Sequence, residues 1–398
     1  MDALMTTLPK DWEIKTFRDI STINQGLQIP ISQRLKAPTE HAKFYITIQA
    51  LNNRKEFEYI KTYNESVVCH KDDILMTRTG NTGMVITNIE GVFHNNFFKI
   101  NFDRTLINKD FLVYFLSLEQ TQRTILKKAG TSTIPDLNHN DFYSLTIPLP
   151  PLNEQIAIAN ILSALDRYLY ALDALILKKE GVKKSLSFEL LSQRKRLKGF
   201  NQAWQRVRLG TYKYRRGSFP QPYGNPQWYS DNGMPFVQVY DVGENFKLTQ
   251  KTKQKISKIA QPMSVFVPKN SVIITLQGTI GRVALTQYDC YCDRTILIFD
   301  NNTLNDVNKY FFVLSLFTKF EEEKRKADGS IIKTITKQTL KDFEIPLPPL
   351  NEQNAIANIL SDLDNEIASL KNKKRQFENI KKALNHDLMS AKIRVLEK

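Results

Sequence analysis

The sequence predicts an α+β protein with an internal duplication, in which two mixed α/β domains alternate with two long helices. A phrase of twenty residues, IPLPPLNEQIAIANILSALD from Ile147 to Asp166, returns 198 residues later from Ile345 to Asp364 with 18 identical positions. Strand and turn patterns precede each copy, and an apolar stripe of helical period follows it. The expected segments are two domains at residues 1–150 and 199–348 and two helices at residues 151–198 and 349–398.

The repeat continues into the blocks that precede the phrase. The segment DILMTRTGNTGMV, from Asp73 to Val85, lies over SVIITLQGTIGRV, from Ser271 to Val283, at the same offset. β-branched and aromatic runs broken by Gly, Asn and Asp predict strands and turns in both blocks. Residues 109–128 and 308–326 have helical spacing. Each block is therefore expected to be an α+β domain, built twice.

The phrase itself predicts the start of a long helix, with Asn153 as the N-cap and Glu154 in the first turn. Apolar residues then recur at intervals of four and three, which is the pattern of a coiled-coil seam. The expected seam residues are Ile158, Leu162, Leu165, Leu169, Leu172 and Ile176 in the first helix and Ile356, Leu360, Leu363, Ile367, Leu370 and Phe377 in the second. Each helix is expected to run for about 40 residues, or roughly 60 Å at 1.5 Å per residue.

Short, uncrossed connections favour an antiparallel pairing of the two helices. Because each domain and helix is a copy, such a pair has an internal pseudo-twofold axis. An ordinary helical hairpin is the alternative, but it does not explain why the blocks are also duplicated. The first helix carries further apolar residues off its seam, among them Tyr168 and Leu175, and these predict a surface covered by a partner.

Charge and targeting signals narrow the class of protein. The chain has a net charge of +15, of which residues 1–150 carry +1 and residues 199–348 carry +8. A basic chain favours a polyanionic partner, although many soluble proteins are mildly basic. The three cysteines form no disulfide framework, and neither a secretory signal nor a membrane span is visible, so a cytoplasmic location is expected.

The sequence offers no catalytic motif. The two Pro-Pro pairs lack the polar and aromatic flanks that an adenine methyltransferase needs around a flipped base. No phosphate-binding loop for ATP is present, and the histidines and cysteines lack the spacing of a zinc site. We therefore expect a protein without catalysis, metal or cofactor of its own.

The tandem layout, the two LPPLNEQ phrases and the RTGNTG loop together resemble the specificity subunit of type I restriction–modification enzymes. The resemblance covers essentially the whole chain. It implies that the blocks are target recognition domains, each reading one half of an asymmetric, bipartite site in double-stranded DNA. It also implies that the helices set the spacing and dock two methylation subunits, which recruit restriction subunits. S-adenosylmethionine, ATP and Mg²⁺ are then expected on those partners.

Candidate DNA contacts come from loops and basic clusters. In the major groove Arg suits guanine, and Asn or Gln suits adenine. The two glycine-rich loops offer Arg78, Thr79 and Asn81 in the first block and Gln277, Thr279 and Arg282 in the second. A turn that needs glycine for its backbone angle is the alternative, and a loop that clamps RNA is a further one.

A second group of candidates comes from a basic, aromatic stretch that begins at Tyr212, from its counterpart INQGLQIP in the first block, and from the segment CDRTILIF. These are Lys213, Arg215, Arg216, Gln25, Gln28 and Arg294. A solvated basic turn would carry the same residues, and Arg294 could also pair within the fold. Two other functions remain open at this point, a stand-alone DNA-binding regulator and an interaction scaffold without a DNA role.

Overall fold

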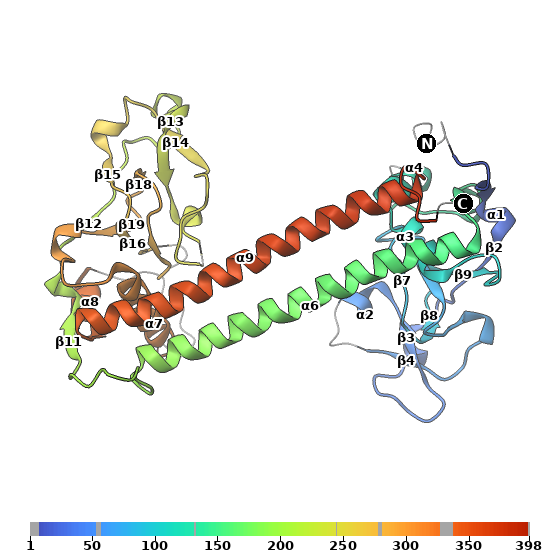
Figure 1. Ribbon diagram of the computed structural model, residues 1–398, viewed down its shortest axis with the longest axis horizontal. Helices are drawn as coiled ribbons and strands as arrows, with labels where there is room; N and C mark the ends of the chain where they lie inside the picture. Colours follow the sequence, from blue (N-terminus) through green and yellow to red (C-terminus); the bar gives the residue numbers. More distant parts are fainter. Residues whose placement is uncertain are drawn as a thin grey trace. The chain divides into compact units, whose positions relative to one another are not determined.

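The computed structural model describes residues 8–52, 57–130, 133–243, 245–277, 281–326 and 337–396. The chain forms two compact units. The first unit contains residues 1–174 and 372–398, and the second contains residues 175–371. Each unit therefore holds one α+β domain, the first part of one long helix and the last part of the other (Figure 1).

The domain of the first unit contains two four-stranded sheets and a separate strand pair. The strand orders are β2-β9-β6-β7, β4-β3-β8-β5 and β1-β10. The strands are β1 (Glu13–Thr16), β2 (Ser21–Gln25), β3 (Lys43–Ile46), β4 (Tyr59–Ile60), β5 (Val68–Cys69), β6 (Ile74–Thr77), β7 (Val85–Ile86), β8 (Gly91–Phe93), β9 (Phe97–Phe102) and β10 (Thr146–Leu149). The short helices are α1 (Phe17–Ile20), α2 (Ile48–Asn52), α3 (Lys109–Leu116), α4 (Glu119–Ala129) and α5 (His139–Tyr143).

The domain of the second unit repeats this topology strand for strand. Its orders are β12-β19-β16-β17, β14-β13-β18-β15 and β11-β20. In both domains one pair is parallel, β3 with β8 and β13 with β18, while the others are antiparallel. The strands are β11 (Gln205–Arg208), β12 (Tyr214–Arg216), β13 (Tyr229–Val237), β14 (Gln254–Ile256), β15 (Val265–Val267), β16 (Val272–Thr275), β17 (Val283–Leu285), β18 (Cys290–Cys292), β19 (Ile296–Phe299) and β20 (Glu344–Leu347), and the short helices are α7 (Lys309–Lys326) and α8 (Lys337–Asp342). The duplication seen in the sequence is thus a duplication of fold.

Apolar packing joins the first domain to both long helices. Phe111 on α3 and Phe98 on β9 lie in one buried cluster with Ile158 and Leu162 from the first long helix. Leu388, near the end of the second long helix, completes the same cluster. The helix ends are therefore part of the domain core. Burial of each such side chain stabilises this packing by about 1.5–3 kcal/mol.

The long helices are α6 (Leu152–Leu191) and α9 (Leu350–Met389), each of 40 residues. Both begin directly after the Pro-Pro pair of the repeated phrase. The backbone carbonyl of Pro151 accepts hydrogen bonds from the amides of Glu154 and Gln155. The prediction that Asn153 caps α6 is wrong, because Asn153 already lies inside the first turn. Proline fits the position before a helix, since its fixed φ angle suits the turn and it has no amide hydrogen to leave unpaired.

Within each unit the two helices run in opposite directions. In the first unit Asp166 pairs with Lys381, and Asp173 pairs with Lys374 at 2.7 Å. In the second unit Lys179 pairs with Glu366 at 2.8 Å. Rising residue numbers on α6 thus meet falling numbers on α9. No helix of the described residues is long and apolar enough to cross a membrane.

Candidate functional site

A buried carboxylate from the repeated phrase is central to the first unit. Glu154 is 2% exposed and lies in the first turn of α6. Its oxygens accept hydrogen bonds from the indole Nε1 of Trp12 at 3.0 Å and from the guanidinium of Arg394 at 2.7 and 2.9 Å. The bonds to Glu154 raise the pKa of Arg394 above its usual range. Asp11 accepts a further hydrogen bond from the guanidinium at 3.0 Å and raises this pKa too. A charge that is buried in this way needs such partners, since an unpaired buried ion costs several kcal/mol.

The second unit contains the same arrangement. Glu352 is 1% exposed and accepts a hydrogen bond from Nε1 of Trp204 at 3.0 Å. Arg196 donates to it at 3.1 and 2.7 Å. Arg196 follows the end of α6, whereas Glu352 begins α9. Each unit is therefore closed by an arginine from the other repeat.

The glutamine that follows each glutamate is also fully engaged. Gln155 is buried; its side-chain oxygen accepts from the amide of Asn108 at 2.9 Å, and its nitrogen donates to two carbonyls, those of Leu106 and Pro150. Gln353 makes the matching contact with the amide of Asn308, also at 2.9 Å. These bonds fix the loop before α3 or α7 to the start of the long helix. We call the Glu–Trp–Arg contact and this Gln–Asn contact together the helix clamp.

An aspartate about three turns further along each helix joins the domain to both helices. Asp166 accepts from the hydroxyl of Tyr114 at 2.7 Å and pairs with Lys381. Burial, and then the bond to Asp166, raises the pKa of Tyr114. In the second unit Asp364 pairs with Tyr310 and Lys183.

The two tyrosines do not occupy equivalent sequence positions. Tyr310 aligns with Asp110, which is four residues before Tyr114 in α3. Four residues make about one helical turn, so either position reaches the same face of the helix. The contact is thus kept while the residue that makes it has moved.

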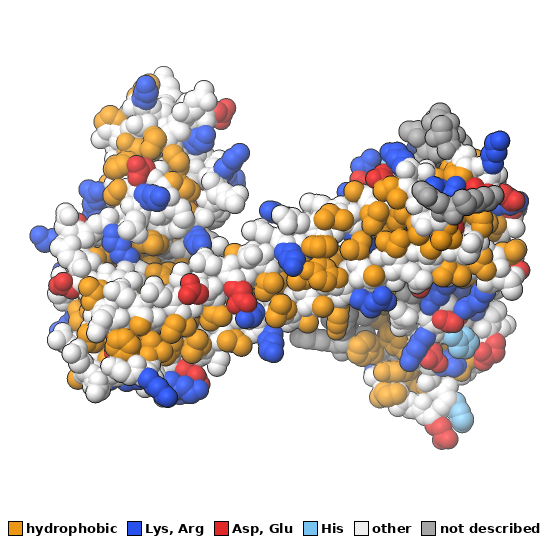
Figure 2. Space-filling view, viewed as in Figure 1, with side chains coloured by type: hydrophobic (Ala, Val, Ile, Leu, Met, Phe, Trp, Pro, Cys, Tyr) orange, Lys and Arg blue, Asp and Glu red, His pale blue; other side chains and the backbone are white. Residues whose placement is uncertain are grey.

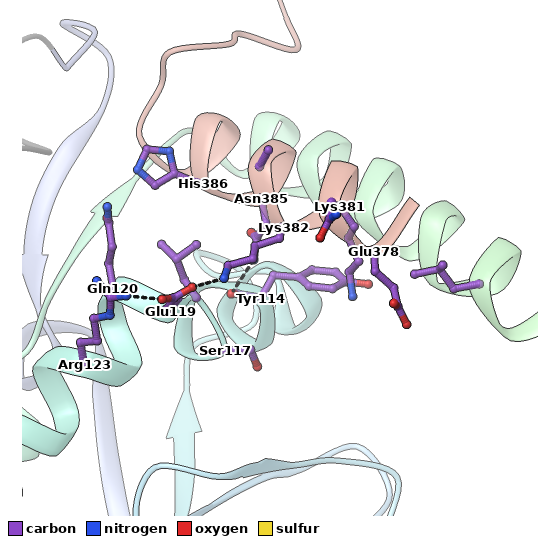
Figure 3. Close-up of a pocket in the computed structure, with 14 residues that line it drawn as sticks. Tyr114, Ser117, Glu119, Gln120, Arg123, Glu378, Lys381, Lys382, Asn385 and His386 are labelled. Atoms are coloured by element: carbon purple, nitrogen blue, oxygen red, sulfur yellow. Dashed lines mark hydrogen bonds and ion pairs between the residues drawn. The ribbon is translucent and has the colours of Figure 1, made fainter. Parts of the chain in front are cut away.

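A groove of about 790 Å³ opens in the first unit between the α3–α4 turn and the last turns of α9 (Figure 3). Glu119 spans one side of it through ion pairs with Lys382 and Arg123. The amide of Asn385 donates to the carbonyl of Tyr114 at 3.3 Å. The groove wall therefore combines the α+β domain of the first unit with α9, and any molecule bound there would contact both.

The predicted seam residues lie on the inner sides of the helices. Each of the twelve is buried or half-buried. Tyr168, expected on a partner-facing surface, instead packs on Phe377 with ring centroids 4.7 Å apart, and Lys373 lies over its ring. This contact with α9 leaves Tyr168 half-buried, and its expected contact with a partner stays a prediction. Leu175 is 38% exposed and remains a surface residue.

The first glycine-rich loop has contacts within its own domain, and its expected DNA contact stays a prediction. Arg78 donates two hydrogen bonds to Asp136, at 2.9 and 2.6 Å, and lies over the ring of Phe98. Thr79 donates to the same carboxylate at 2.8 Å. Arg78 and Thr79 thus hold the loop to Asp136 at the surface of the domain. Asn81 lies exposed at the loop tip.

The glycines of this loop have a conformational reason. Gly80 and Gly83 have φ angles of +84° and +90°, a region that side-chain-bearing residues rarely adopt. The turn that was the alternative to a reading loop therefore accounts for both glycines. In the second loop Gln277 is exposed, and Thr279 lies outside the described residues. Arg282 donates to the carbonyl of Val242 at 3.1 Å and so also has a role within the fold.

The remaining candidates lie at domain edges. Lys213, Arg216, Gln28 and Arg294 are exposed, and Gln25 is half-buried. Arg215 is exposed but donates to the carbonyl of Phe266 at 3.0 Å. Arg294 lies over the ring of Tyr223 at 5.4 Å. The structure brings Gln25 and Gln28 together around one turn, and it places Arg216 and Arg294 around the matching turn of the second unit.

Sequence reasoning missed the helix clamp. The relevant signal was present, since Trp12 and Trp204 begin the two repeats and Arg196 and Arg394 are 198 residues apart. The glutamate had been assigned only a helix-dipole role. Its partners Trp12 and Arg394 lie 142 and 240 residues away in sequence. A local sequence pattern does not indicate contacts at such separations.

Comparison with known proteins gives consistent matches over both units. A family model described as the type I restriction modification DNA specificity domain matches residues 9–180 and 221–379. The chain is 25% identical to a Methanocaldococcus jannaschii protein named putative type I restriction enzyme MjaX specificity subunit, over 98% of this chain and 95% of that protein. It is 24% identical to the type I restriction enzyme MjaVIII specificity subunit of the same organism, over 98% of this chain and 94% of the relative.

Two solved structures have a similar fold. One is the S subunit of a type I restriction-modification system from M. genitalium, with a TM-score of 0.61 and 17% identity over 96% of this chain and 98% of that one. The other was solved to explain complex assembly and conformational transition of the type I R-M system. It has a TM-score of 0.62 and 18% identity, over 96% of this chain and 99% of that one.

We expect Glu154→Ala to lower the free energy of unfolding by at least about 2 kcal/mol. Breaking a buried ion pair costs roughly 3–5 kcal/mol, and the partial exposure of Arg394 reduces that figure. Urea unfolding of the full chain, followed by circular dichroism, measures the change. Glu13→Ala removes a carboxylate from the exposed pair with Lys15 and is the matched control. Equal effects of the two substitutions would contradict a structural role for the clamp.

The Arg78–Asp136 pair makes a different prediction. Arg78→Ala and Asp136→Ala should each destabilise the chain slightly, and the double variant should lose less than the two together, with a coupling of about 0.2–1 kcal/mol. Burial raises the pKa of Asp136, but the bonds from Arg78 and Thr79 outweigh it and hold that pKa below the usual 3.8. The coupling should therefore be present above about pH 4 and vanish as the pH falls through the lowered pKa. Additive effects at pH 7 would show that the pair is not formed in solution.

Proposed function

Because the chain belongs to the family of the type I restriction modification DNA specificity domain, we propose that it is the DNA-specificity subunit of a type I restriction–modification complex. The observation that carries this proposal is the duplicated topology with its repeated helix clamp. Two domains of one fold can present similar faces to the two strands of a duplex. Their loops differ in sequence, so the two half-sites of the DNA target are expected to differ.

The long helices act in this proposal as the spacer between the half-sites. Asp166 pairs with Lys381 in the first unit, and Lys183 pairs with Asp364 in the second. The same antiparallel register therefore applies in both units. This supports one continuous antiparallel coiled coil with a pseudo-twofold axis, whose length sets the number of unread base pairs.

Catalysis in this proposal belongs to other subunits. The chain reads DNA, two methylation subunits bind S-adenosylmethionine and modify the site, and restriction subunits bind ATP and Mg²⁺ and cut unmodified DNA. The buried polar groups of the clamp are consumed in contacts within the fold, which supports a positioning role for them.

A second apolar stripe on α6 supports docking of the methylation subunits. Ile161 is 36% exposed and Leu175 is 38% exposed, on the same side of the helix wheel. At the corresponding positions of α9, Ile359 is also apolar but Lys373 is charged, so the stripe extends further along α6 than along α9. Figure 2 shows apolar side chains gathered on the surface of the long-helix region. A stripe at helical spacing fits the apolar face of a partner helix.

A stand-alone DNA-binding regulator is the second candidate, and the net charge of +8 on residues 199–348 favours it. A methylation map separates the two. If the proposal holds, deleting the gene should abolish methylation at one asymmetric, bipartite motif, and a plasmid copy should restore it. A regulator would leave every methylated motif in place.

We expect Ile161→Glu and Leu175→Glu to weaken assembly with the methylation subunits, because each places a charge in the second stripe. Sedimentation of the mixed subunits measures the complex. Lys184→Glu lies on the opposite side of α6 and is the matched control. Full assembly of both glutamate variants would exclude the stripe as the docking face.

Lengthening both helices should change the spacer of the DNA target. Seven residues inserted after Ala174 and seven after Lys371 keep the heptad register and add about 10 Å of helix. At about 3.4 Å per base pair, the preferred spacer should grow by roughly three base pairs. These pairs rotate one half-site by roughly 100°, so activity is expected to fall.

A methylation map of the lengthened variant gives the spacer and the half-sites. The half-sites should stay as they are, because the domains that read them are untouched. Inserting the residues into one helix alone breaks the register and should abolish assembly. An active double-insertion variant with its original spacer would mean that the helices do not set the distance.

A further inference from the structure

One tight turn occupies the same place in both domains. In the first unit it follows β8, where the amide of Phe97 donates to the carbonyl of His94 at 3.0 Å. In the second it follows β18, where the amide of Ile296 donates to the carbonyl of Asp293, also at 3.0 Å. The second residue of the turn is Asn95 in one domain and Arg294 in the other.

Further backbone contacts confirm that the turns correspond. The amide of His94 donates to the carbonyl of Ile46, and that of Asp293 to the carbonyl of Val237, each at 3.0 Å. The loop residue after β6 donates to the third residue of the first turn, from Arg78 to Asn96 at 2.8 Å. The residue after β16 makes the same bond in the second turn at 2.9 Å.

A glycine seats the edge strand against each turn. A Cβ on Gly26 would lie 2.2 Å from the carbonyl oxygen of His94, and one on Gly217 would lie 2.3 Å from that of Asp293. No larger residue fits either position. The residue before each glycine is thereby held beside the turn, and it is Gln25 in the first unit and Arg216 in the second.

The scaffold is therefore constant, while the side chains that it presents differ in chemistry. The first domain presents the carboxamides of Gln25 and Asn95, and the second presents the guanidinium groups of Arg216 and Arg294. The two arginines are exposed, and neither makes an ion pair with a described residue.

The amides are held only by weak contacts. Asn95 donates to the side chain of Gln28 at 3.3 Å, and its own carboxamide oxygen has no donor among the described residues. The side-chain nitrogen of Gln25 donates to the backbone carbonyl of Asn95 at 3.3 Å, and its side-chain oxygen contacts His139 at 3.2 Å. An acceptor without a donor costs free energy, so turning Asn95 outward to a ligand that offers both a donor and an acceptor would be favourable.

We propose that this turn, with the residue before the glycine, reads a base in each half-site: adenine through Gln25 and Asn95, and guanine through Arg216 and Arg294. A carboxamide matches the N6 donor and N7 acceptor of adenine, and a guanidinium matches the O6 and N7 acceptors of guanine. The inference rests on the proposed function and assigns its specificity to named residues.

Exchanging the side chains of the turn tests the assignment. The full chain, assembled with its methylation subunits, is used to select sites from a randomised DNA library. Arg294→Asn should weaken binding to the original site by about 5- to 150-fold, the range for one bidentate base contact. It should replace or relax one guanine in the second half-site and leave the first half-site unchanged. Asn95→Arg should replace or relax one adenine in the first half-site and leave the second half-site unchanged.

The same turn carries asparagine in the first domain and arginine in the second, so both variants are expected to fold. Arg206→Asn is the matched control, because Arg206 is equally exposed but lies on the separate β11–β20 pair. Uniform weakening by Arg294→Asn on all sequences would identify a phosphate contact and overturn the inference. An unchanged motif in both variants would overturn it too. A wild-type complex that selects no bipartite site would refute the proposed function itself.

Discussion

The structure depends on a single electrostatic constraint, the burial of one glutamate at the start of each long helix. A carboxylate that is almost completely removed from water must be surrounded by donors. For Glu154 these donors come from the beginning of the chain and from the region beyond α9. These hydrogen bonds therefore fix the position and the direction of the first turn of α6 relative to the domain. The repeated phrase carries this constraint in both copies.

The domains could diverge because the constraint lies outside the surfaces that differ between them. Glu154, Gln155 and Asp166 hold the domain through a tryptophan, a loop backbone and a tyrosine hydroxyl. None of these contacts involves the turn after β8 or the glycine-rich loop. New side chains can thus appear on those surfaces without disturbing the attachment of the domain. The shift of the tyrosine by one helical turn between α3 and α7 shows that even the attachment tolerates change, provided that the hydroxyl reaches the aspartate.

The features with a regular period could be predicted from the sequence. The spacing of apolar residues predicts the two helices and their inward-facing residues, and the repeat in the sequence predicts the repeated topology. Asn153 was misassigned as a cap because a good capping residue followed two prolines, and the second proline already occupies that place. Arg78 suggested a base contact because its loop is glycine-rich and basic. Its carboxylate partner, Asp136, lies 58 residues away, and a sequence pattern gives no distance between such residues.

The exchange of arginines between repeats has a consequence for the order of events during synthesis. The second unit is one continuous stretch, residues 175–371, and all of its clamp residues have been translated once the first turn of α9 is made. The first unit is translated first, but Glu154 must wait for Arg394, 240 residues later. The domain made first is therefore completed last, and until then it carries a buried charge without its strongest counterion. A chain that ends before Arg394 contains every contact of the second unit but lacks the main counterion of Glu154, so its first unit is expected to be the less stable of the two.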